Sequence, residues 1–328
     1  YVIGVGTQYL YNPFEDGWML LTSGALGGTF GGSACGCCTS VGPSGTATAG
    51  TTTTLTTNLT LTRNLAGYSI HITAGPGAGD VRTILNNTIG ANSVITVSSA
   101  FSATITTSST YRLMTPRWYI LSPGTQSTTT FKYYDLATNT WTARSVTGLA
   151  ATLGTDGRLV STPSWINTGF VTFSTGTATS ATATTLVDSA KTWTASSFIN
   201  YQVRIVSGTG AGQIRTITAN TTNTLTVATW TTTPDATSTY AIEGNDDNIY
   251  YFGNGATTVY KFSVSGNSWS TLTARGTAGS TGMTAEWVYN SPNAAWTTDT
   301  NIQNGRYIYS VRGGASTAID RYDIAANT

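Results

Sequence analysis

The stretch Phe131-Lys-Tyr-Tyr-Asp-Leu-Ala-Thr-Asn-Thr-Trp141 decides the fold, because it occurs again further along the chain. The second copy is Val259-Tyr-Lys-Phe-Ser-Val-Ser-Gly-Asn-Ser-Trp269, and each copy follows an aromatic segment and a turn that contains glycine. Aromatic and β-branched residues favour strands, and the Asn, Thr, Ser and Gly residues before each Trp favour a tight hairpin turn. The repeat therefore predicts antiparallel sheets built on one kind of hairpin.

A third copy ends in Ile319-Asp-Arg-Tyr-Asp-Ile-Ala-Ala-Asn-Thr328, and a weaker one is Tyr9-Leu-Tyr-Asn-Pro-Phe-Glu-Asp-Gly-Trp18. Together the copies resemble the kelch motif of β-propellers, in which a Gly-Gly strand precedes a Tyr-Asp strand, a turn and a Trp. The resemblance implies that the Trp packs between neighbouring blades, and it assigns motif positions to Tyr134, Asp135, Tyr322, Asp323, Trp18, Trp141 and Trp269. A closed propeller needs about four to eight blades. We therefore expect a partial ring that continues beyond this chain.

A second, longer repeat separates the copies of the first. Residues 45–111 align with residues 176–240, and Gly75-Pro-Gly-Ala-Gly79 in one copy matches Gly208-Thr-Gly-Ala-Gly212 in the other. Short Thr-rich runs bounded by Gly, Asn and Ser predict a compact antiparallel module of about five strands in each copy. The predicted fold is thus all-β, with kelch-like blades in residues 1–44, 112–175 and 241–328 and two β inserts. If the inserts leave the blades at equivalent connections, we expect them to project from the same face.

The glycine-rich turns predict structure rather than phosphate binding. A phosphate loop needs a helix start and commonly a following Lys, and neither is indicated here. Gly75, Gly79, Gly208 and Gly212 instead suit a hairpin turn with positive φ. Arg82 and Arg215 follow the two turns at equivalent positions, and we expect each to brace its turn through hydrogen bonds to backbone carbonyls.

Composition excludes several classes of function. Charged residues make up 9% of the chain and the formal net charge is +1, so no basic field exists to attract nucleic acid. No apolar run approaches the length needed to span a bilayer. Low charge also occurs in disordered chains, but 17 Tyr, 9 Trp and 9 Phe argue for a folded core.

Few residues are candidates for chemistry. Cys35, Cys37 and Cys38 have no second Cys pair to complete a zinc site, so we expect small buried residues lining an inner strand. His71 is the only histidine, which leaves neither the two His ligands of kelch-class copper oxidases nor a plausible catalytic triad. The acidic residues Glu243, Asp246 and Asp247 predict a polar turn before a strand. We expect no cofactor, no metal and no enzymatic activity.

The inserts suggest a function by resemblance. The stretch Gly208-Thr-Gly-Ala-Gly-Gln-Ile-Arg-Thr-Ile217, followed by Trp230 and by Thr-Pro-Asp-Ala-Thr-Ser-Thr-Tyr240, looks like a module of bacteriophage structural proteins. That resemblance implies a virion component of the capsid fibre, decoration, neck or tail, whose partners are other virion proteins or further copies of itself. The alternative is an adhesin that binds host-surface glycans, with Trp193 and Trp230 as stacking platforms. A polysaccharide-degrading enzyme is a third hypothesis.

Overall fold

The computed structural model describes residues 35–122, 130–150, 153, 156–166, 169–287 and 305–328, together with the backbone of three strands nearer the N-terminus. Those strands are β1 (Val2–Ile3), β2 (Gln8–Asn12) and β3 (Gly17–Leu20), which pair as one small sheet. All regular elements in the described part of the chain are β-strands, which confirms the all-β class. Trp18 belongs to β3, and its side chain lies outside the described residues. Within the described ranges, no helix is long and apolar enough to cross a membrane.

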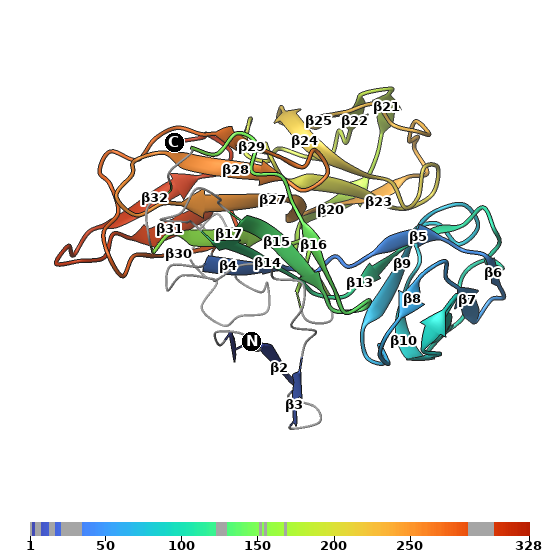
Figure 1. Ribbon diagram of the computed structural model, residues 1–328. Helices are drawn as coiled ribbons and strands as arrows, with labels where there is room; N and C mark the ends of the chain where they lie inside the picture. The colour runs from blue at the N-terminus through green and yellow to red at the C-terminus, as the bar shows by residue number, and fades with distance from the viewer. Residues whose placement is uncertain are drawn as a thin grey trace, which may run out of the picture.

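Three sheets carry the first repeat and form a stack (Figure 1). The first sheet contains β4 (Cys35–Thr39), β14 (Arg117–Ser122), β15 (Thr130–Asp135) and β16 (Thr140–Ala143). The second sheet contains β17 (Arg158–Thr162), β27 (Asn245–Phe252), β28 (Val259–Ser263) and β29 (Ser268–Thr271). The third sheet contains β30 (Thr284–Trp287), β31 (Tyr307–Val311) and β32 (Ile319–Asp323). In each sheet the strands lie side by side in chain order and pair antiparallel.

Aromatic side chains hold the stack together. The ring of Phe131 in the first sheet meets Phe262 and Trp269 in the second, with ring centroids 4.8 and 5.0 Å apart. The indole N–H of Trp269 donates to the carbonyl of Ser145, 3.1 Å away. Trp269 therefore lies between the first and second sheets.

The junction between the second and third sheets is also aromatic. Tyr322 of the third sheet packs on Tyr250 and Phe252 of the second, with centroids 5.9 and 6.2 Å apart. Trp141 instead packs on Trp118 and Tyr134 of its own sheet. The first strands of the sheets are also neighbours, because β17 contacts both β4 and β30.

Each long repeat folds into a sheet of seven strands, which we call the first and the second module. The first module contains β5 (Ser44–Thr46), β6 (Ala49–Gly50), β7 (Thr54–Thr56), β9 (Ser69–Ala74), β10 (Val81–Asn87), β12 (Val94–Val97) and β13 (Thr110–Met114). The second contains β20 (Thr172–Thr177), β21 (Ser180–Thr182), β22 (Thr185–Val187), β23 (Gln202–Ser207), β24 (Ile214–Asn220), β25 (Thr224–Val227) and β26 (Thr239–Glu243). The strand orders, β5-β13-β9-β10-β12-β7-β6 and β20-β26-β23-β24-β25-β22-β21, correspond one to one. The expected count of about five was too low, because several of the strands are only two or three residues long.

The modules occupy equivalent places in the chain. The first lies between β4 and β14, and the second between β17 and β27, so each interrupts the link between the first two strands of a stacked sheet. Both lie on the same side of the stack, at the right of Figure 1. The two modules thus lie next to each other on one side of the stacked sheets. The remaining short strands are β8 (Thr60–Leu61) with β11 (Gly90–Ala91) and β18 (Trp165–Ile166) with β19 (Gly169–Phe170).

The same tyrosine anchors the core of each module. The hydroxyl of Tyr111 donates to Oδ1 of Asn58 at 2.9 Å, and the hydroxyl of Tyr240 donates to Oδ2 of Asp188 at 2.7 Å. A Cβ atom on Gly45 or on Gly176 would lie less than 3.0 Å from the corresponding hydroxyl. Each repeated Gly thus makes room for the buried Tyr of its own module.

The acidic group does not form the predicted turn. Glu243 is the last residue of β26, and Asp246 and Asp247 lie in β27. The strand tolerates these acids because neighbouring side chains bind them: Asp247 accepts from the Ser263 hydroxyl at 2.8 Å, and Ser164 donates to Asp246. The turn prediction was therefore wrong, and the carboxylates are part of the junction between module and sheet.

Candidate functional site between the two modules

The glycine turns have the backbone conformation that the sequence predicted. Gly75, Gly77 and Gly79 have φ values of 77°, 80° and 91°, and Gly208, Gly210 and Gly212 have 79°, 80° and 85°. L-residues with a side chain rarely adopt this region. The N–H of the last Gly in each turn then donates back to an isoleucine carbonyl of its own module, which closes the hairpin.

These turns also bring the two modules into contact. A Cβ atom on Gly79 would lie less than 3.0 Å from the carbonyl oxygen of Val206, and one on Gly212 would come as close to the carbonyl oxygen of Thr73. Thr73 and Val206 each lie two residues before the first Gly of their turn, so the two contacts are equivalent. The modules therefore meet through the same surface on each side, with an approximate two-fold relation.

Arg82 and Arg215 tie each hairpin to a neighbouring loop. The Nε of Arg82 donates to the carbonyl of Ala100 at 2.7 Å, and that of Arg215 donates to the carbonyl of Thr229 at 3.0 Å. Arg82 also pairs with Asp80 at 2.8 Å. Both arginines do brace backbone carbonyls, but the braced segment is the loop after β12 or β25 rather than the glycine turn itself.

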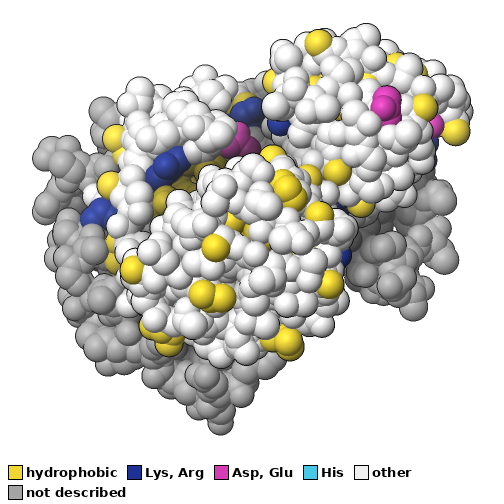
Figure 2. All heavy atoms as spheres, turned by 90° about the vertical axis from the view of Figure 1, so that its right-hand side faces the viewer, with side chains coloured by type: hydrophobic (Ala, Val, Ile, Leu, Met, Phe, Trp, Pro, Cys, Tyr) yellow, Lys and Arg dark blue, Asp and Glu magenta, His cyan; other side chains and the backbone are white. Residues whose placement is uncertain are grey.

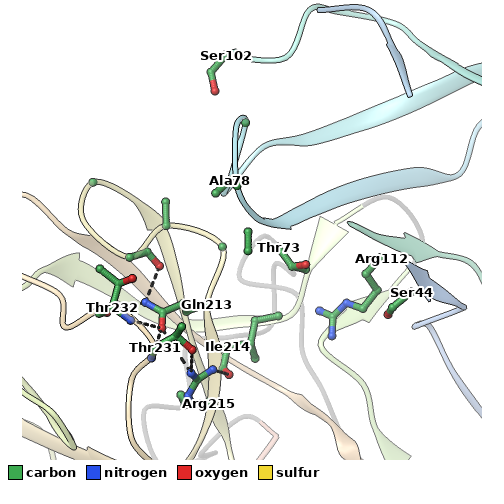
Figure 3. Close-up of a pocket in the computed structure, with 17 residues that line it drawn as sticks. Ser44, Thr73, Ala78, Ser102, Arg112, Gln213, Ile214, Arg215, Thr231 and Thr232 are labelled. Atoms are coloured by element: carbon green, nitrogen blue, oxygen red, sulfur yellow. Dashed lines mark hydrogen bonds between the residues drawn. The ribbon is translucent and has the colours of Figure 1, made fainter. Parts of the chain in front are cut away.

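A cleft of about 680 Å³ lies between the modules at the glycine turns. Figure 3 shows Arg112 reaching from the first module toward the second, opposite Gln213, Ile214 and Arg215. Gln213 is held by hydrogen bonds to the carbonyls of Gly210 and Thr232. Figure 2 shows acidic and basic side chains gathered in the hollow beside the two rounded lobes, whose outer surfaces carry few charges.

At the inner end of the modules, Phe170 lies between two equivalent positions of the repeat. His71 of the first module meets the Phe170 ring at 6.1 Å, and the guanidinium of Arg204 in the second module lies 3.7 Å from the same ring. Nη2 of Arg204 also pairs with Oε1 of Glu243 at 2.6 Å, and both side chains are buried.

The environment of His71 keeps its imidazole neutral. Burial, together with the nearby charges of Arg112 and Arg204, holds the pKa of His71 well below its usual 6.5. Neither ring nitrogen has a hydrogen-bond partner among the residues that the structure describes. The neutral ring packs edge-on against Phe170.

The motif residues of the first repeat close their own hairpins and do not reach the cleft. Asp135 accepts from the N–H of Ala137 at 3.0 Å and from Nε of Arg117 at 2.8 Å. Asp323 likewise accepts from Ala325 and from Arg306, each at 3.0 Å. The hydroxyls of Tyr134 and Tyr322 donate to side-chain oxygens of asparagines in the same turns.

The tryptophans considered for sugar stacking belong to the core of the second module. Trp230 is 4% exposed, and its indole N–H lies 3.3 Å from the carbonyl of Thr185. Trp193 packs edge-on against Phe198 and Tyr240 and donates to the Ser174 hydroxyl. Trp230 has no open ring face for a sugar, so its placement explains packing and not recognition.

The cysteines lie on β4, at the edge of the first sheet, and the expectation that all three are buried was wrong: Cys35 is buried, Cys37 is half-buried and Cys38 is exposed, because side chains alternate between the faces of an edge strand. Burial raises the pKa of Cys35 to about 12. A thiol with such a pKa is protonated at neutral pH and is a poor nucleophile and metal ligand. In the ranges that the structure describes, no three His, Cys, Asp or Glu side chains gather as a metal site would require.

Comparison with known proteins leaves this geometry as the main guide to function. No protein-family model matches the sequence, and no curated protein matches it.

Proposed function

We propose that the chain is a structural protein of a bacteriophage virion, in a capsid fibre, decoration, neck or tail component. In this proposal the stacked sheets are kelch-like propeller blades, and the two modules form one double projection that contacts other virion proteins or further copies of the chain. The observation that carries the proposal is the contact between the glycine turns, because it fixes two lobes of the same fold in one orientation. A rigid, weakly charged double projection suits assembly and surface display.

The propeller part of the proposal has its own support. Successive sheets share one strand order, their first strands are neighbours, and aromatic residues of the repeat lie between them. The outer face of the third sheet is apolar, with Tyr309, Val311 and Ile319 exposed at 36%, 38% and 64%. On the first two sheets, the face that points the same way is covered by the next sheet. A further blade covering this third face would continue the stack.

The use of the ionisable residues also favours architecture over catalysis. Glu243 pairs with Arg204, Asp135 with Arg117, Asp323 with Arg306 and Asp320 with Arg312. The first two pairs join neighbouring strands of one sheet, and Arg306 and Arg312, which flank β31, pair with residues of the neighbouring β32. Their carboxylates are thus engaged in holding the fold together and are not presented to a substrate.

Purified phage particles test the proposal. Quantitative mass spectrometry should find the chain in a fixed ratio to the major capsid protein, and electron cryomicroscopy of the same particles should show a two-lobed projection. Particles that lack the chain, with the protein present only in the lysate, would overturn the virion assignment.

A further inference from the structure

Asn200, in the loop before β23, stands at a position where the first module has a glycine. Asn200 has φ of 70°, and Gly67 at the equivalent position has φ of 87°. The positions correspond because the N–H of Asn200 donates to the carbonyl of Ile217, and that of Gly67 donates to the carbonyl of Ile84. Asn is one of the few residues besides Gly that adopt such a backbone conformation. The second module therefore keeps the backbone of the first and adds a side-chain amide.

The amide of Asn200 is fixed where the second module meets two of the stacked sheets. Its Nδ2 donates to the carbonyl of Ile324, just after β32, at 3.0 Å. Its Oδ1 accepts from Nζ of Lys261 in β28 at 3.1 Å. The backbone carbonyl of Asn200 also accepts from the side chains of Asn245 and Asn248 in β27, at 2.9 and 2.8 Å. These contacts hold the amide against the lysine amine.

Lys261 is likewise particular to its own copy of the repeat. The aligned residues in the other stacked sheets are Tyr133 and Arg321. The amine and the amide thus occur together only in the copies where they meet. Burial lowers the pKa of Lys261, whereas the charge of Asp247 acts to raise it. A partly desolvated lysine releases its proton more readily, and its neutral amine is a nucleophile.

We propose that Lys261 and Asn200 form an isopeptide bond that joins the second module to the second stacked sheet. Nζ attacks Cγ of the amide, a C–N bond forms, and the bond between Cγ and Nδ2 breaks, so that one ammonia leaves. The reaction replaces one amide by another and needs no oxidant, reductant or further reactant. Because Cγ is bonded to the Oδ1 that already contacts Nζ, rotation of the flexible lysine stem brings the reacting atoms together.

Asp247 supplies a carrier for the proton that this reaction moves. The attack leaves a proton on Nζ that must reach the departing Nδ2. Oδ2 of Asp247 accepts from the hydroxyl of Ser263 at 2.8 Å, and Ser263 lies two residues along β28 from Lys261. The charge of Asp247 acts on the amine, so its carboxylate can transfer the proton directly or through one water.

Intact-mass spectrometry of the purified, folded chain tests the bond. The chain should weigh about 17 Da less than its sequence requires, which is the mass of one ammonia. Trypsin should also fail to cleave after Lys261. Lys261→Arg keeps the positive charge, Asn200→Gly restores the residue of the first module, and both variants should have the full mass. Asp247→Asn should slow bond formation about 100-fold.

Two control variants separate this bond from other changes. Succinimide formation at Asn254-Gly255 would also release ammonia, so Asn254→Gln should show the same mass loss as the natural chain. Lys191→Arg should show it too, because Nζ of Lys191 contacts the backbone carbonyl of Thr175 and no side-chain amide.

Three results would each overturn the inference. One is the full sequence mass in the natural chain, with normal cleavage after Lys261. Another is a mass loss that persists in Lys261→Arg, and the third is bond formation at an unchanged rate in Asp247→Asn. The measurement uses the isolated chain, so its failure would leave the proposed place in the virion untouched.

Discussion

The first and second modules have the same strand order and even the same irregularity, a bulge after Ile84 in one and after Ile217 in the other. They differ where they approach Phe170. The first module has His71 and Met114 at the two positions where the second has Arg204 and Glu243. One module therefore buries an uncharged pair and the other buries an ion pair, on the same backbone. The comparison teaches that both copies of the repeat keep the same fold, whereas the residues that approach Phe170 differ between the copies.

The largest effect should come from replacing only one residue of the buried ion pair in the second module by its counterpart in the first module. Glu243→Met leaves Arg204 buried without its partner, and breaking a buried pair in this way costs about 3–5 kcal/mol in the free energy of unfolding. Adding Arg204→His removes the isolated charge, so the double variant should be more stable than Glu243→Met alone. Urea unfolding of the three proteins gives the comparison. A loss below about 1 kcal/mol for Glu243→Met would show that the pair contributes little.

The next effect should come from the glycines at the contact between the modules. Gly79→Ala and Gly212→Ala should each lower the free energy of unfolding by about 2–4 kcal/mol, because positive φ and overpacking add. Gly67→Ala is the matched control. Gly67 has φ of 87° but no atom within 4 Å of the added carbon, so only the backbone cost of about 1 kcal/mol remains. Equal losses at the three positions would mean that the contact is unimportant.

The smallest effect concerns pH and is confined to the first module. The folded pKa of His71 is lowered, so the unfolded chain binds more protons below pH 6.5, and stability is lost as pH falls through that value. His71 should make the free energy of unfolding fall by up to about 1.4 kcal/mol for each unit by which the pH is lowered. His71→Met removes this contribution, and unfolding curves of both proteins between pH 5 and 8 isolate it by difference. Identical pH profiles would contradict a neutral, buried His71.

Much of the fold could be predicted, because the repeats carry strong signals. Alignment of residues 45–111 with 176–240 located both modules, and the Trp spacing located the stacked hairpins. Short strands such as β6 and β21 were missed, since two or three Thr-rich residues give no alternation to detect. Asp246 and Asp247 were assigned to a turn because their partners, Ser164 and Ser263, are distant in sequence or on another strand.

The candidate site was harder to predict than the fold. A hairpin turn alone is enough to explain glycines at positions 79 and 212. The sequence therefore gave no indication that these glycines also touch the other module. A usable signal was nevertheless present: His71 changes to Arg204 and Met114 to Glu243 between the copies, which marks two neighbouring positions that differ together. Arg112 gave no signal, because its place in the cleft between the modules becomes apparent only in three dimensions.

The central claim is that the modules are locked together through equivalent glycine turns, and a double-mutant cycle tests it most directly. If Gly79 and Gly212 serve one shared contact, the loss in unfolding free energy for Gly79→Ala with Gly212→Ala should fall short of the sum of the single losses by at least about 1 kcal/mol. Gly67→Ala combined with Gly212→Ala should be additive. Additivity within about 0.5 kcal/mol for the Gly79 and Gly212 pair would show two independent turns and would contradict the account.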